Sequence, residues 1–394
     1  WKQSELGEVL SGMYNGQTPS RFSAENWGGK INWLTSGELN QGVVMKTIEK
    51  ITPIGQKDAN LRVVPEGTFI MAITGLEAAG TRGSCARLGI PTTLNQSCMA
   101  LFPKENLLDS GFLFQWYKKI GESYGLKYTQ GTKQQSYNAE LVKILPIILP
   151  NVAEQKEISN FLDNLDQTIA FQQRKLEKMK SMKSAYLSEM FPAEGERKPK
   201  RRFPGFTDDW EQRELGEVAD IIGGGTPSTS VKEFWDGDID WYSPVEIGDK
   251  VFVNGSQKKI TKLGFQKSSA QMLPAGTVLF TSRAGIGNTA ILEKAACTNQ
   301  GFQSIVPKEN LDTYFIFSRS HELKRYGEIT GAGSTFVEVS GKQMAKMPIL
   351  IPDIEEQKEI GNFFHNLDQT IAFQQQKLEK LQNIKKAYLN EMFI

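Results

Sequence analysis

The chain has little of what zinc proteins, secreted proteins and membrane proteins need. It contains two histidines and three cysteines in 394 residues, and Cys85, Cys98 and Cys297 show no CxxC spacing. This pattern argues against a zinc site and is typical of a reducing compartment, so we expect a cytoplasmic protein. No run of about 18 apolar residues occurs, so no membrane span is expected, and the first residues do not read as a signal peptide.

Motifs for catalysis are also missing. There is no GxxxxGK[ST] loop for ATP, no N-P-P-[YF] motif for adenine methylation, and the glycines at 223–225 open toward Thr-Pro rather than toward a cofactor-binding helix. Asp353 and Glu356 superficially resemble a nuclease motif, but they sit too close together at a helix start, where acidic residues favour the helix dipole. We therefore expect no catalytic residue and no metal ligand.

The chain also lacks an excess of positive charge. The net charge is +1, with 39% hydrophobic and 23% charged residues, which describes a soluble globular protein. Most DNA-binding proteins are visibly basic because contacts to phosphates dominate their affinity. If this chain binds DNA, its cations must be clustered locally, or a partner must supply part of the phosphate contact.

What the chain does have is an internal duplication. Residues 154–191 recur as 356–393, with 28 of 38 positions identical. The preceding regions correspond only in islands: Trp1 and Trp210, LGEV at 6–9 and 215–218, GQTPS at 16–20 and GGTPS at 224–228, PKENL at 103–107 and 307–311. The layout is globule, helix, globule, helix, in which the helical parts are nearly identical and the globular parts share a framework.

Each repeated segment carries an apolar stripe with the 4-3 spacing of a coiled coil, interrupted in the first copy by Gln172 and Lys183. We expect the following residues of the stripe to form a helix–helix or partner interface: Ile158, Leu162, Leu165, Ile169, Leu176, Tyr186, Ile360, Phe364, Leu367, Ile371, Leu378 and Tyr388. Each helix would be about 57 Å long. The two helices most simply pack antiparallel on each other; the alternative is a homodimeric coiled coil made by each helix separately.

The globules are predicted to be mixed α/β. Strands are expected at 68–74 and 277–282, further strands at 144–149 and 347–351 just before each long helix, and shorter helices at 107–117 and 311–323. The predicted domains are a first globule (1–151), a central helical region (152–192), a linker (193–209), a second globule (210–352) and a distal helical region (353–394).

A set of motifs, in the order in which they follow along the chain, resembles one family, the specificity subunits of type I restriction-modification systems. They are RFPGFTDDWEQRELGEV at 202–218, GGGTPST at 223–229, TSRAGIG at 281–287, TNQG at 298–301 and PDIEEQKEI at 352–360. The first half carries weaker forms of the same signals, so the resemblance covers essentially the whole chain. Two departures exist. The first globule starts at Trp1, the counterpart of Trp210, without the leading segment of the second, and residues 75–83 match 283–287 only loosely.

The resemblance implies an α+β chain of two target-recognition domains joined by two long antiparallel helices with a pseudo-twofold axis. Such a chain would be non-catalytic and would read a split site in double-stranded DNA. It would direct two modification subunits that methylate adenine, and restriction subunits where present. S-adenosylmethionine, ATP and Mg²⁺ are expected on those partners, and no cofactor on this chain. The alternatives are a coiled-coil scaffold for proteins, or a specificity subunit for a methyltransferase without a nuclease partner.

Base reading is expected from donors on loops, because Arg, Lys, Asn and Gln can form paired contacts with base edges. The candidates are Arg82, Arg87, Lys133, Gln134 and Gln135 in the first domain, and Ser282, Arg283, Ser334, Thr335 and Lys342 in the second. Trp33 and Trp241 occur at matching positions of both domains and are predicted to be core residues.

Overall fold

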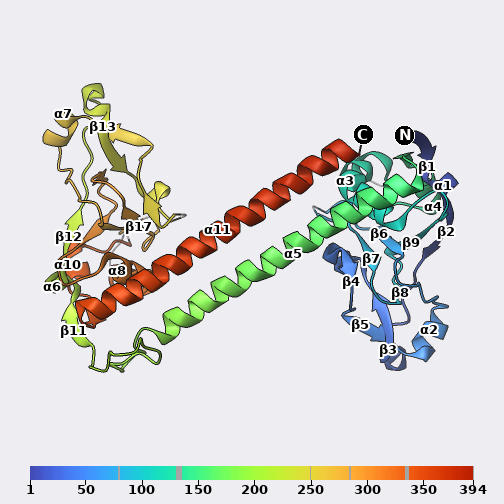
Figure 1. Cartoon of the computed structure of the whole chain (residues 1–394), viewed down its shortest axis with the longest axis horizontal. Coiled ribbons are helices and arrows are strands. Elements are labelled where there is room, and N and C mark those ends of the chain that lie inside the picture. Colours follow the sequence, from blue (N-terminus) through green and yellow to red (C-terminus); the bar gives the residue numbers. More distant parts are fainter. Residues whose placement is uncertain (79, 130–134, 249, 284, 333–336, 394) are drawn as a thin grey trace. The chain divides into compact units, whose positions relative to one another are not determined.

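The computed structural model describes residues 1–78, 80–129, 135–248, 250–283, 285–332 and 337–393 (Figure 1). By its contacts the chain divides into two compact units. Unit 1 is Trp1–Arg174 with Gln376–Ile394, and unit 2 is Lys175–Gln375. Each unit therefore combines one globule with parts of both long helices.

The strands of unit 1 are β1 (Lys2–Glu5), β2 (Leu10–Asn15), β3 (Trp27–Leu34), β4 (Val43–Val44), β5 (Glu49–Ile51), β6 (Phe69–Ala72), β7 (Cys85–Leu88), β8 (Thr93–Leu94), β9 (Cys98–Pro103) and β10 (Pro146–Leu149). Those of unit 2 are β11 (Glu211–Glu214), β12 (Ala219–Gly223), β13 (Trp235–Tyr242), β14 (Phe252–Val253), β15 (Lys258–Ile260), β16 (Val278–Phe280), β17 (Thr289–Leu292), β18 (Cys297–Thr298), β19 (Gln303–Pro307) and β20 (Pro348–Ile351).

The helices are α1 (Leu6–Val9), α2 (Pro53–Asp58), α3 (Ser110–Tyr128), α4 (Ala139–Lys143), α5 (Val152–Glu189), α6 (Leu215–Val218), α7 (Lys262–Gln266), α8 (Thr313–Ser318), α9 (Ser320–Gly331), α10 (Gly341–Ala345) and α11 (Ile354–Met392). Short 3-10 turns are found at η1 (Ala24–Asn26), η2 (Ser36–Gln41), η3 (Lys232–Phe234) and η4 (Pro244–Glu246). None of the described helices is long and apolar enough to cross a membrane.

The two units share one sheet topology. Unit 1 has a five-stranded sheet of order β2-β9-β6-β7-β4 and a three-stranded sheet β5-β3-β8, and unit 2 repeats both as β12-β19-β16-β17-β14 and β15-β13-β18. The last strand before each long helix pairs antiparallel with the first strand of its globule, β1 with β10 and β11 with β20. The predicted mixed α/β duplication is therefore confirmed, and the structure adds that the strand order is the same in both units.

The shared framework has a physical basis in matching buried residues. Trp33 is 2% exposed and donates its indole N–H to the carbonyl of Gln17, while Trp241 is 6% exposed and donates to the carbonyl of Gly225. A buried indole needs such an acceptor. Both tryptophans are core residues, as predicted.

The long helices α5 and α11 begin at Val152 and Ile354, two residues before the repeated segments 154–191 and 356–393. These starts lie within one residue of the predicted ones at 152 and 353. The side chain of Asn151 accepts a hydrogen bond from the backbone N–H of Glu154, and Asp353 does the same for Glu356, each at 3.0 Å. These contacts satisfy backbone donors that a helix start leaves free. Each cap follows a proline, Pro150 or Pro352, which cannot donate to a preceding turn.

Within each unit the two helices run antiparallel. In unit 1 the rings of Phe161 and Tyr388 meet edge to face at 4.9 Å, and Lys385 further back along α11 contacts Asp166 further along α5. In unit 2 the equivalent rings of Tyr186 and Phe363 lie 5.1 Å apart. The helices of one chain therefore pair with each other, as predicted, rather than each requiring a second copy.

The apolar stripe packs against the globules as well as between the two helices. Leu162 belongs to the core of unit 1 with Ile158 packed against it, while Ile360 and Phe364 belong to the core of unit 2. Leu176 and Leu378 are buried further along the helices. The ends of the stripe thus attach the helices to the globules, a role beyond the helix–helix contact that the spacing predicts.

Candidate DNA interface

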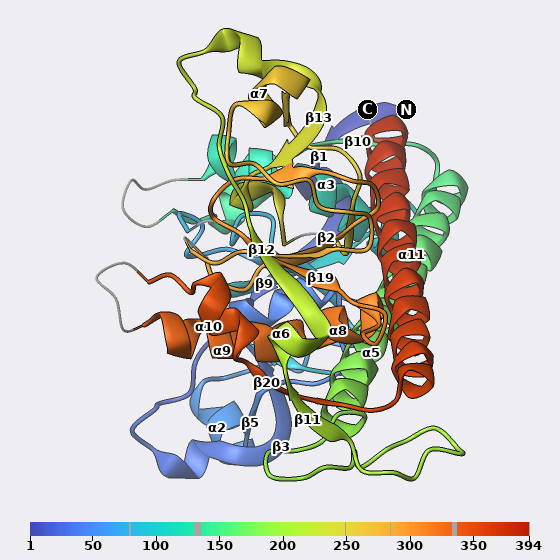
Figure 2. The ribbon, with the colours of Figure 1, turned by 90° about the vertical axis from the view of Figure 1, so that its left-hand side faces the viewer.

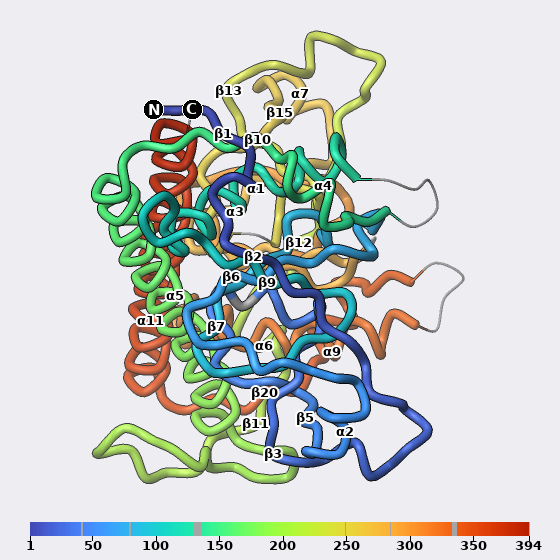
Figure 3. Tube along the Cα trace, turned by 90° about the vertical axis from the view of Figure 1, so that its right-hand side faces the viewer, coloured from blue at the N-terminus to red at the C-terminus, as the bar shows by residue number. Residues whose placement is uncertain are grey.

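In each unit two segments that are distant in sequence meet at the ends of inner strands of the large sheet; Figures 2 and 3 show the chain from its two opposite sides. In unit 1 the turn between β6 and β7 meets the segment between α3 and α4, where the N–H of Tyr137 donates to the carbonyl of Ile73 at 2.8 Å. In unit 2 the turn between β16 and β17 meets the segment between α9 and α10, where the N–H of Val339 donates to the carbonyl of Ser282 at 3.1 Å. These are the segments from which most candidate reading residues come.

In unit 1 the turn brings Arg82 and Gln135 together. The guanidinium of Arg82 donates from Nη2 and Nε to Oε1 of Gln135, at 3.0 and 3.3 Å, and the backbone N–H of Gln135 donates to Glu77. The pair is half-buried, and Nη1 of Arg82 has no partner among the described residues. Lys133 and Gln134 lie outside the described residues.

In unit 2 the corresponding turn presents Arg283. Its backbone forms a bridge with Glu338, and its half-buried side chain makes no hydrogen bond or ion pair with any residue that the structure describes. Gly287 closes the turn with φ +93°, and a Cβ there would come within 2.4 Å of Lys324. That close approach requires glycine. Lys342 is exposed on α10, while Ser334 and Thr335 lie outside the described residues.

The structure corrects the assignment of Arg87. This residue lies in β7 and faces α5, where its Nη2 is 2.5 Å from a carboxylate oxygen of Asp163 and its guanidinium lies over the ring of Phe114. Asp163 also accepts a hydrogen bond from Gln115 at 2.8 Å. Arg87 therefore attaches the sheet to the helix, and its donors are not presented to DNA.

Ser282 also fails as a reading residue. Its side chain is fully buried and its hydroxyl has no hydrogen-bond partner among the described residues. Its backbone N–H donates to the carbonyl of Gly301 and its carbonyl accepts from Val339. Ser282 is thus part of the framework that holds Arg283 in place, and a base edge cannot reach its hydroxyl.

Two surface aromatics were missed by the sequence analysis. Phe171 on α5 is 57% exposed, and Phe373, the equivalent residue on α11, is 67% exposed. A single exposed apolar side chain is ordinary on a protein surface, but the duplication exposes the same phenylalanine at equivalent positions of both helices. The available signal was an identical phenylalanine off the stripe in both copies of the repeat.

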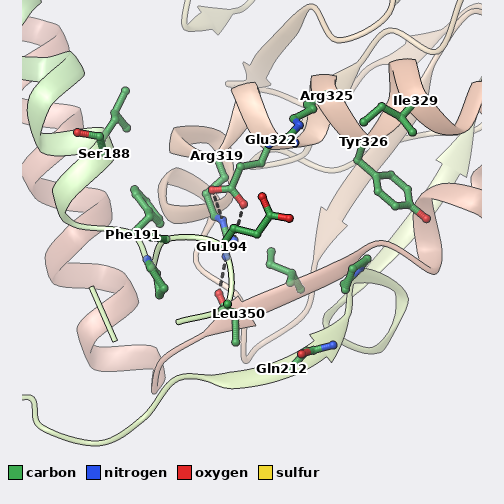
Figure 4. A pocket seen from close by; sticks show the side chains of 16 residues that line it. Ser188, Phe191, Glu194, Gln212, Arg319, Glu322, Arg325, Tyr326, Ile329 and Leu350 are labelled. Atoms are coloured by element: carbon green, nitrogen blue, oxygen red, sulfur yellow. Dashed lines mark hydrogen bonds and ion pairs between the residues drawn. The ribbon is translucent and has the colours of Figure 1, made fainter. Parts of the chain in front are cut away.

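Unit 2 contains a groove of about 640 Å³ between the end of α5, helix α9 and strand β20 (Figure 4). Arg319 lies at its floor, where it pairs with Glu322 at 2.6 Å and donates to the carbonyl of Leu350. Glu194 enters from the segment after α5. The arginine is 6% exposed and fully engaged, so it serves to join the helix to the strand and does not offer a free charge to a ligand.

Metal or thiol chemistry finds no support in the described residues, where no three His, Cys, Asp or Glu side chains are grouped to hold a metal ion. All three cysteines are free and buried. Burial raises the pKa of Cys85 to about 12 and that of Cys297 to about 11, and it raises the pKa of Cys98 further. Such thiols remain protonated near neutral pH and are poor nucleophiles.

Comparisons with known proteins agree with this picture. The 32% identical stretch shared with the "Type I restriction enzyme MjaIX specificity subunit" of Methanocaldococcus jannaschii covers 191 residues, 47% of this chain and 44% of that relative. The "Putative type I restriction enzyme MjaX specificity subunit" of the same organism is 24% identical over 99% of this chain and 92% of its own length. The chain thus spans under half of the first relative and nearly all of the second.

The fold is also found among solved structures. The S subunit of a type I restriction-modification system from M. genitalium superimposes with a TM-score of 0.65 at 14% identity, covering 100% of this chain and 96% of that one. The family described as "Type I restriction modification DNA specificity domain" matches twice, over residues 1–181 and 207–383. The chain therefore belongs to the specificity subunits of type I restriction-modification systems, which serve in DNA target recognition and are not themselves enzymes.

Proposed function

We propose that each unit reads one half of a split site in double-stranded DNA, and that the chain thereby directs adenine methylation to that site. The observation that carries this proposal is the pair of adjoining segments present in both units. The hydrogen bonds from Tyr137 to Ile73 and from Val339 to Ser282 hold the same arrangement twice. A shared framework with different loop residues is what two different half-sites require.

The β6–β7 turn of unit 1 and the β16–β17 turn of unit 2 carry different side chains, as the reading of two different half-sites requires. Residues 73–84 in unit 1 form a longer connection than residues 281–288 in unit 2, and they place Arg82 against Gln135. Unit 2 instead offers Arg283 without a described partner. Because arginine contacts guanine through two hydrogen bonds, each turn can select bases at its own half-site.

The near-neutral charge of the chain supports a division of labour with its partners. With a net charge of +1, the chain by itself has little long-range attraction for DNA. We infer that two modification subunits contribute phosphate contacts and carry S-adenosylmethionine, and that restriction subunits, where present, carry ATP and Mg²⁺. The site of action would be cytoplasmic bacterial or archaeal DNA, in keeping with the reducing setting that the cysteines indicate.

The docking sites for two modification subunits are assigned to the exposed aromatics of the helices. Phe171 and Phe373 occupy equivalent positions of the repeat and are both more than half exposed. Two copies of one partner need the same surface twice, which a duplicated helix provides. An aromatic anchor that becomes buried is the usual centre of such an interface.

A titration with the matching modification subunit tests the docking. We expect the wild-type chain to bind two copies by mass photometry, Phe171→Ala or Phe373→Ala to bind one copy at the same concentration, and the double variant to bind neither. Phe22→Ala is the matched control, because Phe22 is fully exposed but lies on the globule of unit 1. Unchanged stoichiometry in the double variant would place the docking surface elsewhere.

DNA binding by the assembled complex is tested by its salt dependence. A complex that contacts several phosphates should lose affinity steeply as salt rises, with a slope close to the number of contacts. We expect that behaviour for a DNA fragment carrying both half-sites and a weaker complex for a fragment carrying one. Affinity that is independent of salt and of DNA sequence would instead indicate a scaffold for proteins.

A further inference from the structure

Both units hold one exposed glutamine in the same way. Gln96 lies just before β9 in unit 1, and Gln300 lies just before β19 in unit 2. Each follows an asparagine, Asn95 or Asn299, whose side chain accepts a hydrogen bond from the backbone N–H two residues further on, at 3.1 and 2.8 Å. Such a bond closes a tight local turn, so each glutamine is presented at a turn of fixed shape.

A series of hydrogen bonds connects the core of each globule to its glutamine. In unit 1 the buried indole of Trp33 donates to the carbonyl of Gln17, and the hydroxyl of the next residue, Thr18, donates to the side-chain oxygen of Gln96. Unit 2 repeats these bonds with the equivalent residues Trp241, Gly225, Thr226 and Gln300. The amide nitrogen Nε2 of each glutamine makes no hydrogen bond with a described residue, so its donors are available to a ligand.

The segment that carries the threonine also packs directly on the turn. A Cβ on Gly16 would come within 2.1 Å of the carbonyl oxygen of Leu94, and a Cβ on Gly224 would come within 1.9 Å of that of Asn299. Only glycine permits so close an approach of two backbone segments. Because the glutamine is already held in place, it loses little conformational freedom when it binds a ligand.

The two glutamines adjoin the turns assigned to base reading. The backbone N–H of Ile73 donates to the carbonyl of Ser97 at 2.9 Å, and that of Ser282 donates to the carbonyl of Gly301 at 2.8 Å. Nε of Arg283 lies 3.6 Å from the place that a Cβ on Gly301 would take. Each glutamine is thus one residue away from a direct contact with the reading turn of its unit.

The reading turns differ between the units, whereas the threonine–glutamine pair is identical in both. The bases of two half-sites differ, but a phosphate offers the same oxygens at every base pair, and glutamine is among its usual donors. We propose that Gln96 and Gln300 each donate from Nε2 to a DNA phosphate and thereby position the duplex against the neighbouring reading turn. This inference rests on the proposed function, since it assigns a shared contact to two units that read DNA.

The first test measures the affinity of the assembled complex for duplexes in which each base pair of both half-sites is changed in turn. Q96A and Q300A should each weaken binding to every duplex by the same factor of about tenfold, because a hydrogen bond to a charged group is lost. The order of preference among the duplexes should not change. A loss that depends on one particular base pair would mean that the glutamine reads a base edge, and would overturn the inference.

Glutamate variants separate contact with DNA from support of the turn. Q96E and Q300E keep an acceptor for the threonine hydroxyl, so the free energy of unfolding should change little, but their negative charge repels a phosphate. We expect them to bind every duplex more weakly than the alanine variants, with a difference that shrinks as salt rises. Wild-type affinity in Q96E and Q300E would show that the glutamines only support the turn, and would also overturn the inference.

Lysine variants give an independent readout. Q96K/Q300K should steepen the dependence of log affinity on log salt by about 1.8, which is about 0.9 for each neutralised phosphate. Gln3 and Gln212 supply the matched control Q3K/Q212K, because they are exposed at equivalent positions of β1 and β11, outside the large sheets. The control should keep nearly the wild-type slope, and an equal steepening in both double variants would contradict a contact at Gln96 and Gln300.

This inference and the proposed function fail in different ways. If the wild-type complex binds all duplexes equally, the proposed function fails, and the alanine and glutamate variants still decide whether the glutamines contact phosphate. If the wild-type complex selects one split site and the alanine and glutamate variants bind it with wild-type affinity, the proposed function holds and the phosphate contact is refuted.

Discussion

Removing the guanidinium of Arg283 should relax the base preference of one half-site. Arg283 lies on the turn between β16 and β17, and its half-buried side chain makes no hydrogen bond or ion pair with a described residue. The backbone of the preceding buried Ser282 is hydrogen-bonded to Gly301 and Val339. Arg283→Ala therefore removes a base-reading group without breaking a hydrogen bond or ion pair to a described residue of unit 2. The free energy of unfolding should change by less than about 0.5 kcal/mol, as for most surface substitutions.

The magnitude on DNA follows from the contact that arginine makes. A paired hydrogen bond to one base contributes about 1–3 kcal/mol of discrimination, which is roughly a 5- to 150-fold change in affinity. Arg283→Ala should lose that factor on the native site and lose almost nothing on a site already altered at the contacted base. Arg283→Lys should recover charge but not the paired geometry, and so should recover only part of the preference.

The assay is binding of the assembled complex to a set of duplexes in which each base pair of both half-sites is changed in turn. We expect relaxed preference at one position of one half-site, with the other half-site unaffected. A uniform loss on every sequence, together with a salt slope reduced by about one, would mean that Arg283 contacts a phosphate. That result would refute the reading role given to this turn.

Two further predictions concern stability. Arg87→Ala should lower the free energy of unfolding of unit 1 by about 1–3 kcal/mol, because it leaves the partly buried Asp163 without its charged partner. Base preference should stay unchanged; chemical denaturation measures the first effect and the same duplex set measures the second. A change in base preference without lost stability would instead make Arg87 a base-reading residue. Burial alone would raise the pKa of Asp240, but hydrogen bonds from groups that include Lys294 hold it at about 2, below its ordinary 3.8. The associated stability, about 1–2 kcal/mol once screening of the half-exposed lysines is allowed for, is present above about pH 4 and is lost as the pH falls toward 2. Denaturation at pH 7, 4 and 2 should therefore show Asp240→Asn costing most at pH 7 and least at pH 2, and a cost independent of pH would contradict the assignment.

The helices could be predicted from the sequence because periodicity and caps are local signals. The stripe, Pro150 and Pro352 located the starts of α5 and α11 to within two residues. In the sequence, Lys183 is visible only as an interruption of this stripe. The spacing cannot reveal that this lysine contacts Asp368 on the other helix. A contact between residues far apart in sequence depends on the assembled fold.

The candidate site was only partly predictable for the same reason. The segments around Arg82 and Arg283 were recognisable by their polar and glycine-rich character, and the fold brings each beside a second predicted segment. Arg87 could not be told apart from these by residue type, because its orientation toward Asp163 is set by the alternation of β7 and by the helix packed on that face. Ser282 likewise follows a buried strand whose path into the core is not visible in the sequence.

Base-resolution mapping of adenine methylation across genomic DNA tests the central claim most directly. The matching modification subunit would be expressed with and without this chain. We expect methylation only in the presence of the chain, confined to one motif made of two short half-sites with a fixed spacer. Stable assembly of the chain with the modification subunit, but no site-specific methylation, would contradict the account and leave the helices as a docking scaffold.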